Sequence, residues 1–465
     1  MTESFVTNTD AFLARRRALH EQLSGPVLLA AGEPASRNYP ANRHRFRATS
    51  HFLYFVGRPL AGSAVLFDAG RSTLFTLPPD PDDALWHGPR PPLTELATEL
   101  GFDAVRPLDQ LDAILAPLRE KLATLPTQDA PSARWLSERL GRPVLERTGA
   151  ALGDARDAAL ADAMIALRLC HDDAAVEQLR HAARVSAKAH VAGMLATRTD
   201  GTESDVHAAM LAVLRKNGLE DAYGPIVTVH GEVLHSDDHS QPTRPGDLLL
   251  ADVGGETAEG WAADITRTWP VSGRFSPTQR AIYEVVLAAQ GAAIAVAKPG
   301  RRYRDTHEAA KRTLVEGLVA LGIFRGDVDG LLDRGAAALF FPHGIGHLLG
   351  LDVHDMEDLG DRAGYAPGRT RSTRFGDGYL RLDRDLVAGM AVTIEPGFYQ
   401  VPGILSDPRR TDPLGADLRR DVLAKYADVR GIRIEDDVLI TKDGNEVLSS
   451  GAPKTVAEIE ALMQP

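Results

Sequence analysis

The chain has 465 residues, about three times the length of a typical domain, so two domains are expected. Its 44% hydrophobic, 25% charged and 6% aromatic residues are typical of a globular protein and exclude collagen-like and extensively disordered classes. The net charge of −12 comes from acids spread along the chain, which argues against a nucleic-acid partner. No run of eighteen apolar residues occurs, so no membrane partner is expected.

The single cysteine, Cys170, excludes an intramolecular disulfide and a thiolate metal cage. Any metal ion would therefore be bound by His, Asp and Glu. Such cysteine usage favours a reducing compartment, and we expect a cytoplasmic location. The stretch Met1–Leu23 has helical spacing around a basic cluster and lacks the apolar core of an export signal.

The N-terminal part alternates short β-type runs with Gly and Pro, and helical patterns follow to about residue 123. This pattern predicts a compact α/β domain. Helical spacing resumes over Arg147–Leu169, and we expect the domain boundary near residue 160. The expected strands are Pro26–Ala30, Phe52–Val56, Ser63–Phe67 and Ser72–Leu77.

The C-terminal part contains two β-rich hairpin regions that alternate with helical patterns. Each hairpin region carries two acidic residues inside apolar strands. The pattern predicts an α/β domain in which a pseudo-symmetric pair of half-sheets faces a shared cleft. The hairpin regions are Asp247–Val271 and Ala391–Ile440, and the expected helices are Ala174–Thr197, Gln279–Ala297 and Arg304–Leu321.

The first hairpin places a carboxylate in a strand that must be largely buried. Asp252 ends the apolar run Leu248–Ala251, where an ionised carboxylate is costly unless it is paired or bound to a metal. On the returning strand, Asp264 shares a face with Thr266 and Thr268, so it can meet Asp252 across the hairpin. Aspartates that merely cap turns at strand ends remain the structural alternative.

The second hairpin repeats the arrangement. Glu395 ends the apolar run Ala391–Ile394, and the returning strand carries Arg433 and Glu435 on one face. We therefore expect Arg433 to lie beside Glu435. A purely structural salt bridge between these two residues is the alternative.

Three histidines, His343, His347 and His354, lie close together in otherwise apolar sequence. Three core histidines so close would be unusual. Helical spacing could place His343 and His347 on one face, but Gly344 stands where the zinc-protease motif H-E-x-x-H has its glutamate. A further histidine, His235, is on its own more typical of a structural or surface position.

Four carboxylates and one imidazole form an oxygen-rich set of donors that suits two Mn²⁺ ions. Zn²⁺, Co²⁺ and Fe²⁺ tolerate the same donors. Two divalent ions would neutralise the clustered acids, lower the pKa of a shared water and stabilise both ends of a displacement at a peptide carbonyl. The donor set therefore predicts a hydrolase.

The chain resembles the pita-bread peptidases, the superfamily of creatinase and methionine aminopeptidase, and within it aminopeptidase P and prolidase. The resemblance covers nearly all of residues 165–465 and rests on four ordered segments: Leu248–Thr268, His343–His354, Val392–Tyr399 and Gly431–Thr441. Two further segments are more loosely similar to the N-terminal domain of both subfamilies: Arg45–Gly57 and Leu85–Gly88.

The resemblance implies an α/β (α+β) fold. Residues 1–160 would form an N-terminal creatinase-like domain of the aminopeptidase P type. Residues 161–465 would form the C-terminal pita-bread catalytic domain with its pseudo-twofold half-sheets. It also implies a homodimer or homotetramer.

The resemblance further implies roles for individual residues. The metal ligands would be Asp252, Asp264, His347, Glu395 and Glu435, with Asp264 and Glu435 bridging the two ions. Glu395 would also handle the proton of the nucleophile. The substrate and the developing oxyanion would be held by His343 and His354. His235 would line the proline pocket, while Arg433, Tyr399 and Thr266 would orient the ligands.

The sequence departs from the family pattern in three places. It has Asp252-Val253-Gly254 where the family often has D-A-G, and one residue more than expected separates Asp252 from Asp264. The inserts 355–385 and 401–429 are long and look more like those of prolidase.

Two substrate classes follow from the resemblance. An Xaa-Pro aminopeptidase cleaves after the first residue of peptides with proline second, and the N-terminal segments favour this activity slightly. An Xaa-Pro dipeptidase needs a cation for the substrate carboxylate, and Arg381 resembles the prolidase arginine with that role. A metal-free creatinase-like hydrolase or a binding module is the more remote alternative.

Arg381 gives a first test. If Arg381 binds the C-terminal carboxylate of a dipeptide, Arg381→Ala will lower dipeptide turnover more than tripeptide turnover, because only the dipeptide places its carboxylate there. Steady-state rates on Ala-Pro and Ala-Pro-Ala measure the difference. Equal effects on both substrates would remove Arg381 from carboxylate binding.

Overall fold

The computed structural model describes residues 9–23, 25–127, 129–144 and 152–464 and divides the chain into two compact units. The first unit consists of Met1–Ala174, Ala258–Gly260 and Met356–Ala363. The second consists of Ala175–Thr257, Trp261–Asp355 and Gly364–Pro465. Residue 160, the expected boundary, lies inside helix α7 (Ala155–Arg168) of the first unit.

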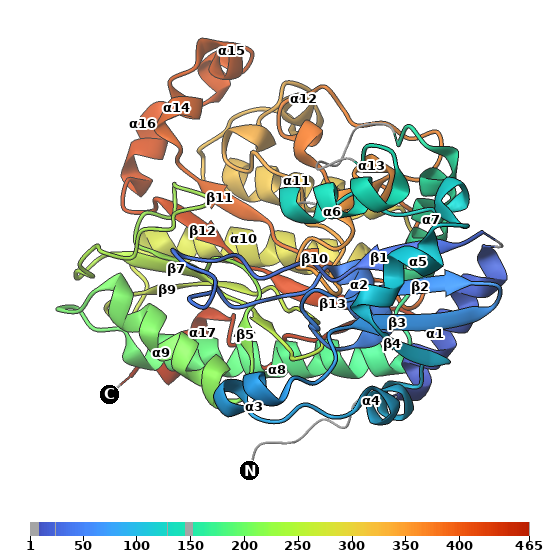
Figure 1. The fold of residues 1–465 in the computed structure, drawn as a ribbon. Coiled ribbons are helices and arrows are strands. Elements are labelled where there is room, and N and C mark those ends of the chain that lie inside the picture. Colours follow the sequence, from blue (N-terminus) through green and yellow to red (C-terminus); the bar gives the residue numbers. More distant parts are fainter. Residues whose placement is uncertain (1–8, 24, 128, 145–151, 465) are drawn as a thin grey trace. The chain divides into compact units, whose positions relative to one another are not determined.

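The first unit is built on a four-stranded sheet in the order β1-β2-β3-β4. The first three strands are antiparallel, and β4 runs parallel to β3. Figure 1 shows this sheet in shades of blue. The strands are β1 (Val27–Ala30), β2 (Ala64–Asp68), β3 (Arg71–Thr76) and β4 (Ala104–Pro107). The helices are α1 (Thr9–Gln22), α2 (Ser50–Val56), α3 (Pro81–His87), α4 (Leu93–Leu100), α5 (Leu111–Leu115), α6 (Ala130–Leu140) and α7.

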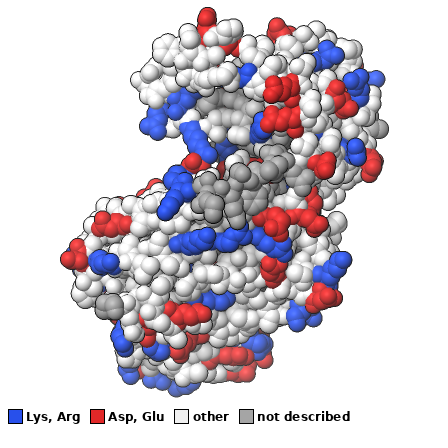
Figure 2. Space-filling model, turned by 90° about the horizontal axis from the view of Figure 1, so that it is seen from below, with Lys and Arg blue, Asp and Glu red and all other residues white. Residues whose placement is uncertain are grey.

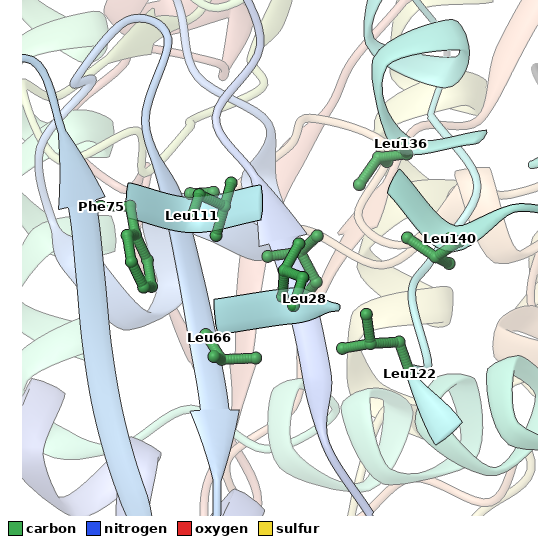
Figure 3. Packing of buried hydrophobic residues seen from close by; sticks show 9 residues of the cluster. Leu28, Leu66, Phe75, Leu111, Leu122, Leu136 and Leu140 are labelled. Carbon is green, nitrogen blue, oxygen red and sulfur yellow. The ribbon is translucent and has the colours of Figure 1, made fainter. Parts of the chain in front are cut away.

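One face of this sheet buries a leucine-rich cluster (Figure 3). The antiparallel register sets Leu28 of β1 opposite Leu66 of β2, so their side chains are neighbours on the same face. Leu111 of α5 and Leu136 of α6 pack against the same cluster. Helices α5 and α6 therefore cover this face of the sheet.

One expected strand is wrong. The stretch Phe52–Val56 forms helix α2, whereas the other three expected strands correspond to β1, β2 and β3. Every α2 residue from His51 to Val56 is buried, so the run has no polar face that would distinguish a helix from a strand. Gly57 ends the helix in the left-handed conformation, with φ of 71°, and donates its N–H to the carbonyl of Leu53.

The second unit combines long helices with several small antiparallel sheets, ordered β6-β7-β9, β10-β13-β14, β11-β12 and β5-β8. Its strands are β5 (Glu220–Asp221), β6 (Ile226–Thr228), β7 (Leu248–Asp252), β8 (Gly255–Glu256), β9 (Thr266–Pro270), β10 (Ala391–Ile394), β11 (Gly397–Tyr399), β12 (Gly431–Arg433), β13 (Asp436–Ile440) and β14 (Asn445–Val447). Its helices are α8 (Asp173–Ala196), α9 (Glu203–Lys216), α10 (Pro277–Val296), α11 (Tyr303–Ala320), α12 (Val328–Asp333), α14 (Pro402–Leu405), α15 (Pro408–Thr411), α16 (Arg420–Leu423) and α17 (Val456–Leu462). The short α13 (Asp361–Gly364) belongs almost entirely to the first unit.

The long helices begin where local signals place them. Ser276 caps α10 by accepting the N–H of Gln279, whose side chain accepts the N–H of Ser276 in return. Pro277 at the first helical position needs no N–H partner. The expected helices Ala174–Thr197, Gln279–Ala297 and Arg304–Leu321 correspond to α8, α10 and α11 with ends shifted by one or two residues.

The strands of both hairpin regions end or break at carboxylates. Asp252 is the last residue of β7, and Asp264 lies just before β9. Glu395 follows the end of β10, and Glu435 lies between β12 and β13. Across the first hairpin, Asp252 pairs with Thr266 and not with Asp264. Each carboxylate thus lies at the last residue of a strand or within two residues of a strand end.

Acidic and basic side chains are interspersed over the face drawn in Figure 2. Ion pairs between side chains that are at least partly exposed include Arg180 with Glu446 and Arg280 with Glu460. Such exposed pairs contribute little to stability. Among the described residues, no helix is both long and apolar enough to cross a membrane.

The first-unit core gives a stability prediction. Leu66 is only 4% exposed, so Leu66→Ala removes buried contacts and is expected to lower the free energy of unfolding by about 2–5 kcal/mol. Leu85→Ala, at a position 82% exposed, is the matched control and should change it little. Urea denaturation measures both. Equal losses for the two variants would contradict the packing of this core.

Candidate metal centre

A cavity of about 500 Å³ lies within the second unit. It brings together most of the candidate residues from both hairpin regions and from the segment between them. Its lining includes Asp252, Asp264, His347, Glu395 and Glu435, and also His235, His343, His354, Arg381 and Arg433. The remaining two candidates, Thr266 and Tyr399, donate or accept hydrogen bonds with lining residues.

The two aspartates of the first hairpin meet through a tyrosine. The hydroxyl oxygen of Tyr223 lies 2.6 Å from Asp252 Oδ1 and 2.7 Å from Asp264 Oδ1. The backbone N–H of Asp264 donates to the buried carboxylate of Asp437, at 3.1 Å. These contacts fix where both aspartates point. The sequence analysis missed Tyr223 and Asp437, because neither belongs to a pattern of spacing.

The histidine segment is extended and not helical, so the helical spacing of His343 and His347 is not how the chain brings them together. It runs along the edge of β10, where the N–H of Thr393 donates to the carbonyl of His347 and that of Glu395 to Ile345. The approach is so close that a Cβ on Gly346, whose φ is +149°, would lie 2.4 Å from the Thr393 carbonyl oxygen. Glycine is therefore required at this position.

His347 presents one ring nitrogen to the carboxylates. Its Nδ1 lies 3.0 Å from the carbonyl of Leu348 and donates to it, which assigns the proton to Nδ1. Nε2 then faces Asp264 Oδ2 at 3.3 Å and Glu395 Oε1 at 3.8 Å. Burial lowers the pKa of His347, but the hydrogen bond and charge of Asp264 outweigh burial and raise it overall. A ring anchored to the backbone through one nitrogen, with the other nitrogen directed at carboxylates, is the usual arrangement of a metal-binding histidine.

Glu435 has one satisfied and one unsatisfied oxygen. Oε2 accepts a hydrogen bond from the hydroxyl of Thr266 at 2.6 Å. Oε1 is buried and has no hydrogen-bond partner among the described residues. Donor atoms of Asp264, His347 and Glu435 lie within 4.8 Å of one another. An unpartnered buried carboxylate oxygen in such a group is costly unless a cation binds it.

The electrostatics of the cluster point the same way. Burial, together with the neighbouring carboxylates, raises the pKa of Asp252 to about 6 and that of Glu395 to about 7. The same causes raise the pKa of Glu435 well above its usual range. Burial also acts to raise the pKa of Asp264, but hydrogen bonds from His347 and Tyr223 lower it overall. Four carboxylates share the protein cations Arg433 and His347, so the residues fit divalent cations.

Arg433 connects the two hairpin regions. Its Nη2 donates to Asp252 Oδ2 at 2.7 Å, its Nε to Thr266 Oγ1 at 3.0 Å and its Nη1 to the hydroxyl of Tyr399 at 3.0 Å. Arg433 forms its ion pair with Asp252, not the purely structural salt bridge with Glu435 that was the alternative, and Thr266 Oγ1 links Arg433 to Glu435. The planar guanidinium can hold several partners at once.

His343 is held as a neutral ring. Burial and the nearby Arg433 lower its pKa to about 3. Its Nδ1 lies 2.8 Å from the carbonyl of Gly344, which accepts that proton, and Nε2 accepts the hydroxyl of Tyr399 at 2.9 Å. Because Nδ1 is also 3.8 Å from Glu395 Oε2, His343 lies directly against the carboxylate cluster.

The remaining candidates lie around the cluster. The ring centroids of His354 and His347 are 4.2 Å apart, so His354 borders the same carboxylates. His235 lines the cavity, and burial together with the charges of Arg433 and Arg381 lowers its pKa. Arg381 lines the cavity too, in the segment that also contributes Tyr379. The structure thus brings every candidate residue to one cavity or to its immediate surroundings.

The raised pKa values predict a pH-dependent response to cations. The folded-state values of Asp252 and Glu395, about 6 and 7, exceed their usual values of 3.8 and 4.5. Their contribution to stability is full below the usual values and is lost as pH rises through the folded-state values. Cation-free protein should therefore become less stable as the pH rises from the usual pKa values to the folded-state values.

Adding Mn²⁺ to chelator-treated protein should then raise the thermal unfolding midpoint more at about pH 8 than at about pH 5.5, because ionised carboxylates bind the ion. Differential scanning calorimetry at both pH values measures the shifts. Asp252→Asn should reduce the difference between them. Equal shifts at both pH values in the unmodified protein would contradict the description of the cluster.

Comparisons with known proteins identify the family of the chain. Residues 177–442 match the model of metallopeptidase family M24, and residues 12–125 match that of the aminopeptidase P N-terminal domain. The probable Xaa-Pro aminopeptidase of Penicillium rubens is 36% identical over 430 residues, which cover 90% of this chain and 88% of the relative. The probable Xaa-Pro aminopeptidase of Podospora anserina is 34% identical over 428 residues, which cover 91% of this chain and 89% of the relative.

Solved structures agree across both units. Pseudomonas aeruginosa aminopeptidase PepP is 34% identical, with a TM-score of 0.81 and 99% of each chain covered. Aminopeptidase P from E. coli with the inhibitor Pro-Leu is 29% identical, with a TM-score of 0.78 and the same coverage. The expected fold class, an aminopeptidase P-type N-terminal domain followed by a pita-bread domain, is confirmed. The chain therefore belongs to metallopeptidase family M24, in the group whose members carry an aminopeptidase P N-terminal domain.

Proposed function

We propose that the protein is an Xaa-Pro aminopeptidase, which hydrolyses the bond between an N-terminal residue and a following proline. The observation that carries the proposal is the cluster of four carboxylates around His347 in one cavity: Asp252, Asp264 and Glu435, which are buried, and Glu395, which is partly buried. The names of the relatives support the same substrate class. Membership of a metallopeptidase family supports the need for divalent metal ions.

The five clustered residues would hold two divalent cations, with Asp264 and Glu435 shared between them. The oxygen-rich donors suit Mn²⁺ best, and Zn²⁺, Co²⁺ or Fe²⁺ are alternatives. Such cations supply Lewis-acid chemistry, because they lower the pKa of a water molecule and stabilise negative charge on the attacked carbonyl oxygen. The orphaned Oε1 of Glu435 and the Nε2 of His347 are the donor atoms that support this assignment most directly.

Glu395 is the proposed general base and acid. Its carboxylate lines the cavity and lies 3.8 Å from Nε2 of His347, and a carboxylate in this position can accept and release a proton. It would take the proton of the attacking water and pass it to the proline nitrogen as the peptide bond breaks. His343 Nδ1 lies 3.8 Å from Oε2, and because that ring is neutral it adds no positive charge beside Glu395.

The other lining residues would hold the peptide. His354 lies against His347, where it can donate to the carbonyl oxygen that gains charge. His343 would help to hold the substrate, and His235 would line the side that receives the proline ring. Arg433, Tyr399 and Thr266 would keep the carboxylates oriented through their hydrogen-bond network. Arg381 would face the substrate beyond the proline.

Further expectations rest on the same proposal. Because of the long inserts and Arg381, an Xaa-Pro dipeptidase activity is the second candidate function. The expected homodimer or homotetramer remains a prediction. The cytoplasmic location, expected from the single cysteine, also remains one.

A peptide series tests the proposal. With Mn²⁺ present, Ala-Pro-Ala should be cleaved to release alanine, whereas Ala-Ala-Ala and N-acetylated Ala-Pro-Ala should not, because the site requires proline and a free amine. Glu395→Gln should lower kcat by about 10²–10⁴-fold. Glu446→Gln, which alters an exposed ion pair with Arg180, is the control and should leave the rate unchanged.

Chromatographic quantification of the released alanine follows each reaction. Turnover of Ala-Pro alone, without any turnover of Ala-Pro-Ala, would favour the dipeptidase alternative. No turnover of either peptide by the Mn²⁺-loaded protein would contradict both proposals.

A further inference from the structure

The cavity has a buried end and an exposed end. At the buried end, Asp264, His347 and Glu435 are no more than 5% exposed. At the other end, Tyr379 also lines the cavity but is 58% exposed. A peptide longer than the reacting pair of residues can leave the cavity past Tyr379.

Two segments build this exposed end, and both lie in the long inserts, in which a role has so far been considered for Arg381 alone. Residues 371–381 contribute Phe375 and Tyr379, and the residues before and within α14 contribute Val401 and Ile404. Figure 1 shows α14, α15 and α16 together beyond strand β11. We call Phe375, Tyr379, Val401 and Ile404 the aromatic wall.

The first segment is anchored to the helices behind it. Arg374 donates to the carbonyl oxygens of Leu332 and Asp333 at the end of α12, the second at 2.7 Å. Lys311 of α11 forms an ion pair with Asp377 at 2.8 Å, with both side chains largely buried. This ion pair contributes to a pKa of Asp377 below its usual range, against the effect of burial. The segment is therefore a fixed surface.

A cation–π contact joins the second segment to the first. The guanidinium of Arg410, in α15, lies 3.6 Å from the centroid of the Phe375 ring. Tyr379 meets the same ring edge to face, with centroids 6.1 Å apart. One face of Phe375 is thus covered by Arg410 while the ring lines the cavity. Such a contact restricts the ring and holds the two inserts together.

We propose that the aromatic wall binds the side chain of the residue that follows the proline and favours an apolar one. This inference rests on the proposed function. An Xaa-Pro aminopeptidase accepts only one residue before the scissile bond, so everything after the proline passes the exposed end. The wall offers apolar and aromatic surface there, and Arg410 is a positioning residue that fixes Phe375.

Two tripeptide amides test the proposal. Ala-Pro-Leu-NH₂ and Ala-Pro-Gly-NH₂ differ only in the third side chain, and their amides remove any carboxylate interaction with Arg381. The wild-type protein with Mn²⁺ should have a kcat/KM about tenfold higher for the leucine peptide, as expected for burial of one aliphatic side chain. Phe375→Ala and Tyr379→Ala should lower this ratio towards one, through KM and not through kcat.

Arg410 has a matched control on the same short helix. Arg410 and Arg409 both form ion pairs with Asp407, but only Arg410 lies over Phe375. Arg410→Ala should lower the leucine-to-glycine ratio several-fold and Arg410→Lys should restore part of it, because the cation remains. Arg409→Ala should leave the ratio unchanged.

The outcomes separate the inference from the function on which it rests. If both peptides are cleaved with equal kcat/KM by the wild type, or if neither wall variant changes the ratio, the aromatic wall does not recognise the third residue. If neither peptide is cleaved, the proposed function itself fails and the inference with it. Thermal unfolding of each variant confirms folding, and the exposed Tyr379 provides a second wall variant that retains both Phe375 and Arg410.

Discussion

The second unit depends on holding four carboxylates in a space with too few protein cations to balance them. Asp252, Asp264, Glu395 and Glu435 converge on one cavity, and Arg433 supplies the permanent positive charge among them. Buried carboxylates in a medium of low polarity repel one another and resist ionisation, which appears here as raised pKa values for three of the four. Divalent cations remove this penalty, so the folded site and its metal binding are coupled.

The rest of the domain can be understood as a support for that cluster. Strands end or break where a carboxylate turns inwards, and the hydrogen bonds of Arg433, Thr266 and Tyr399 join the two hairpin regions behind it. Tyr223 bridges the aspartates from a third direction. The inserts then extend the site outwards, so that chemistry at the buried end and recognition at the exposed end are carried by different parts of the chain.

Much of the site could be predicted from the sequence because an acidic residue next to a strongly apolar run is easy to recognise. Asp252 follows a run of leucines and Glu395 an equally apolar run, and neither can be ionised there without compensation. Helix α10 was predictable from its spacing and from the cap at Ser276. The strand at Phe52–Val56 was predicted wrongly, since a short run buried on every side looks the same as strand or helix.

Tyr223 and the pairing of Arg433 with Asp252 depend on contacts between distant segments, which no local pattern encodes. The most direct test of the account is a crystal structure of the Mn²⁺-loaded protein with an anomalous difference map. The account predicts two manganese peaks in the cavity, coordinated by the four carboxylates and by Nε2 of His347. A map with those side chains pointing apart, or without manganese between them, would contradict it.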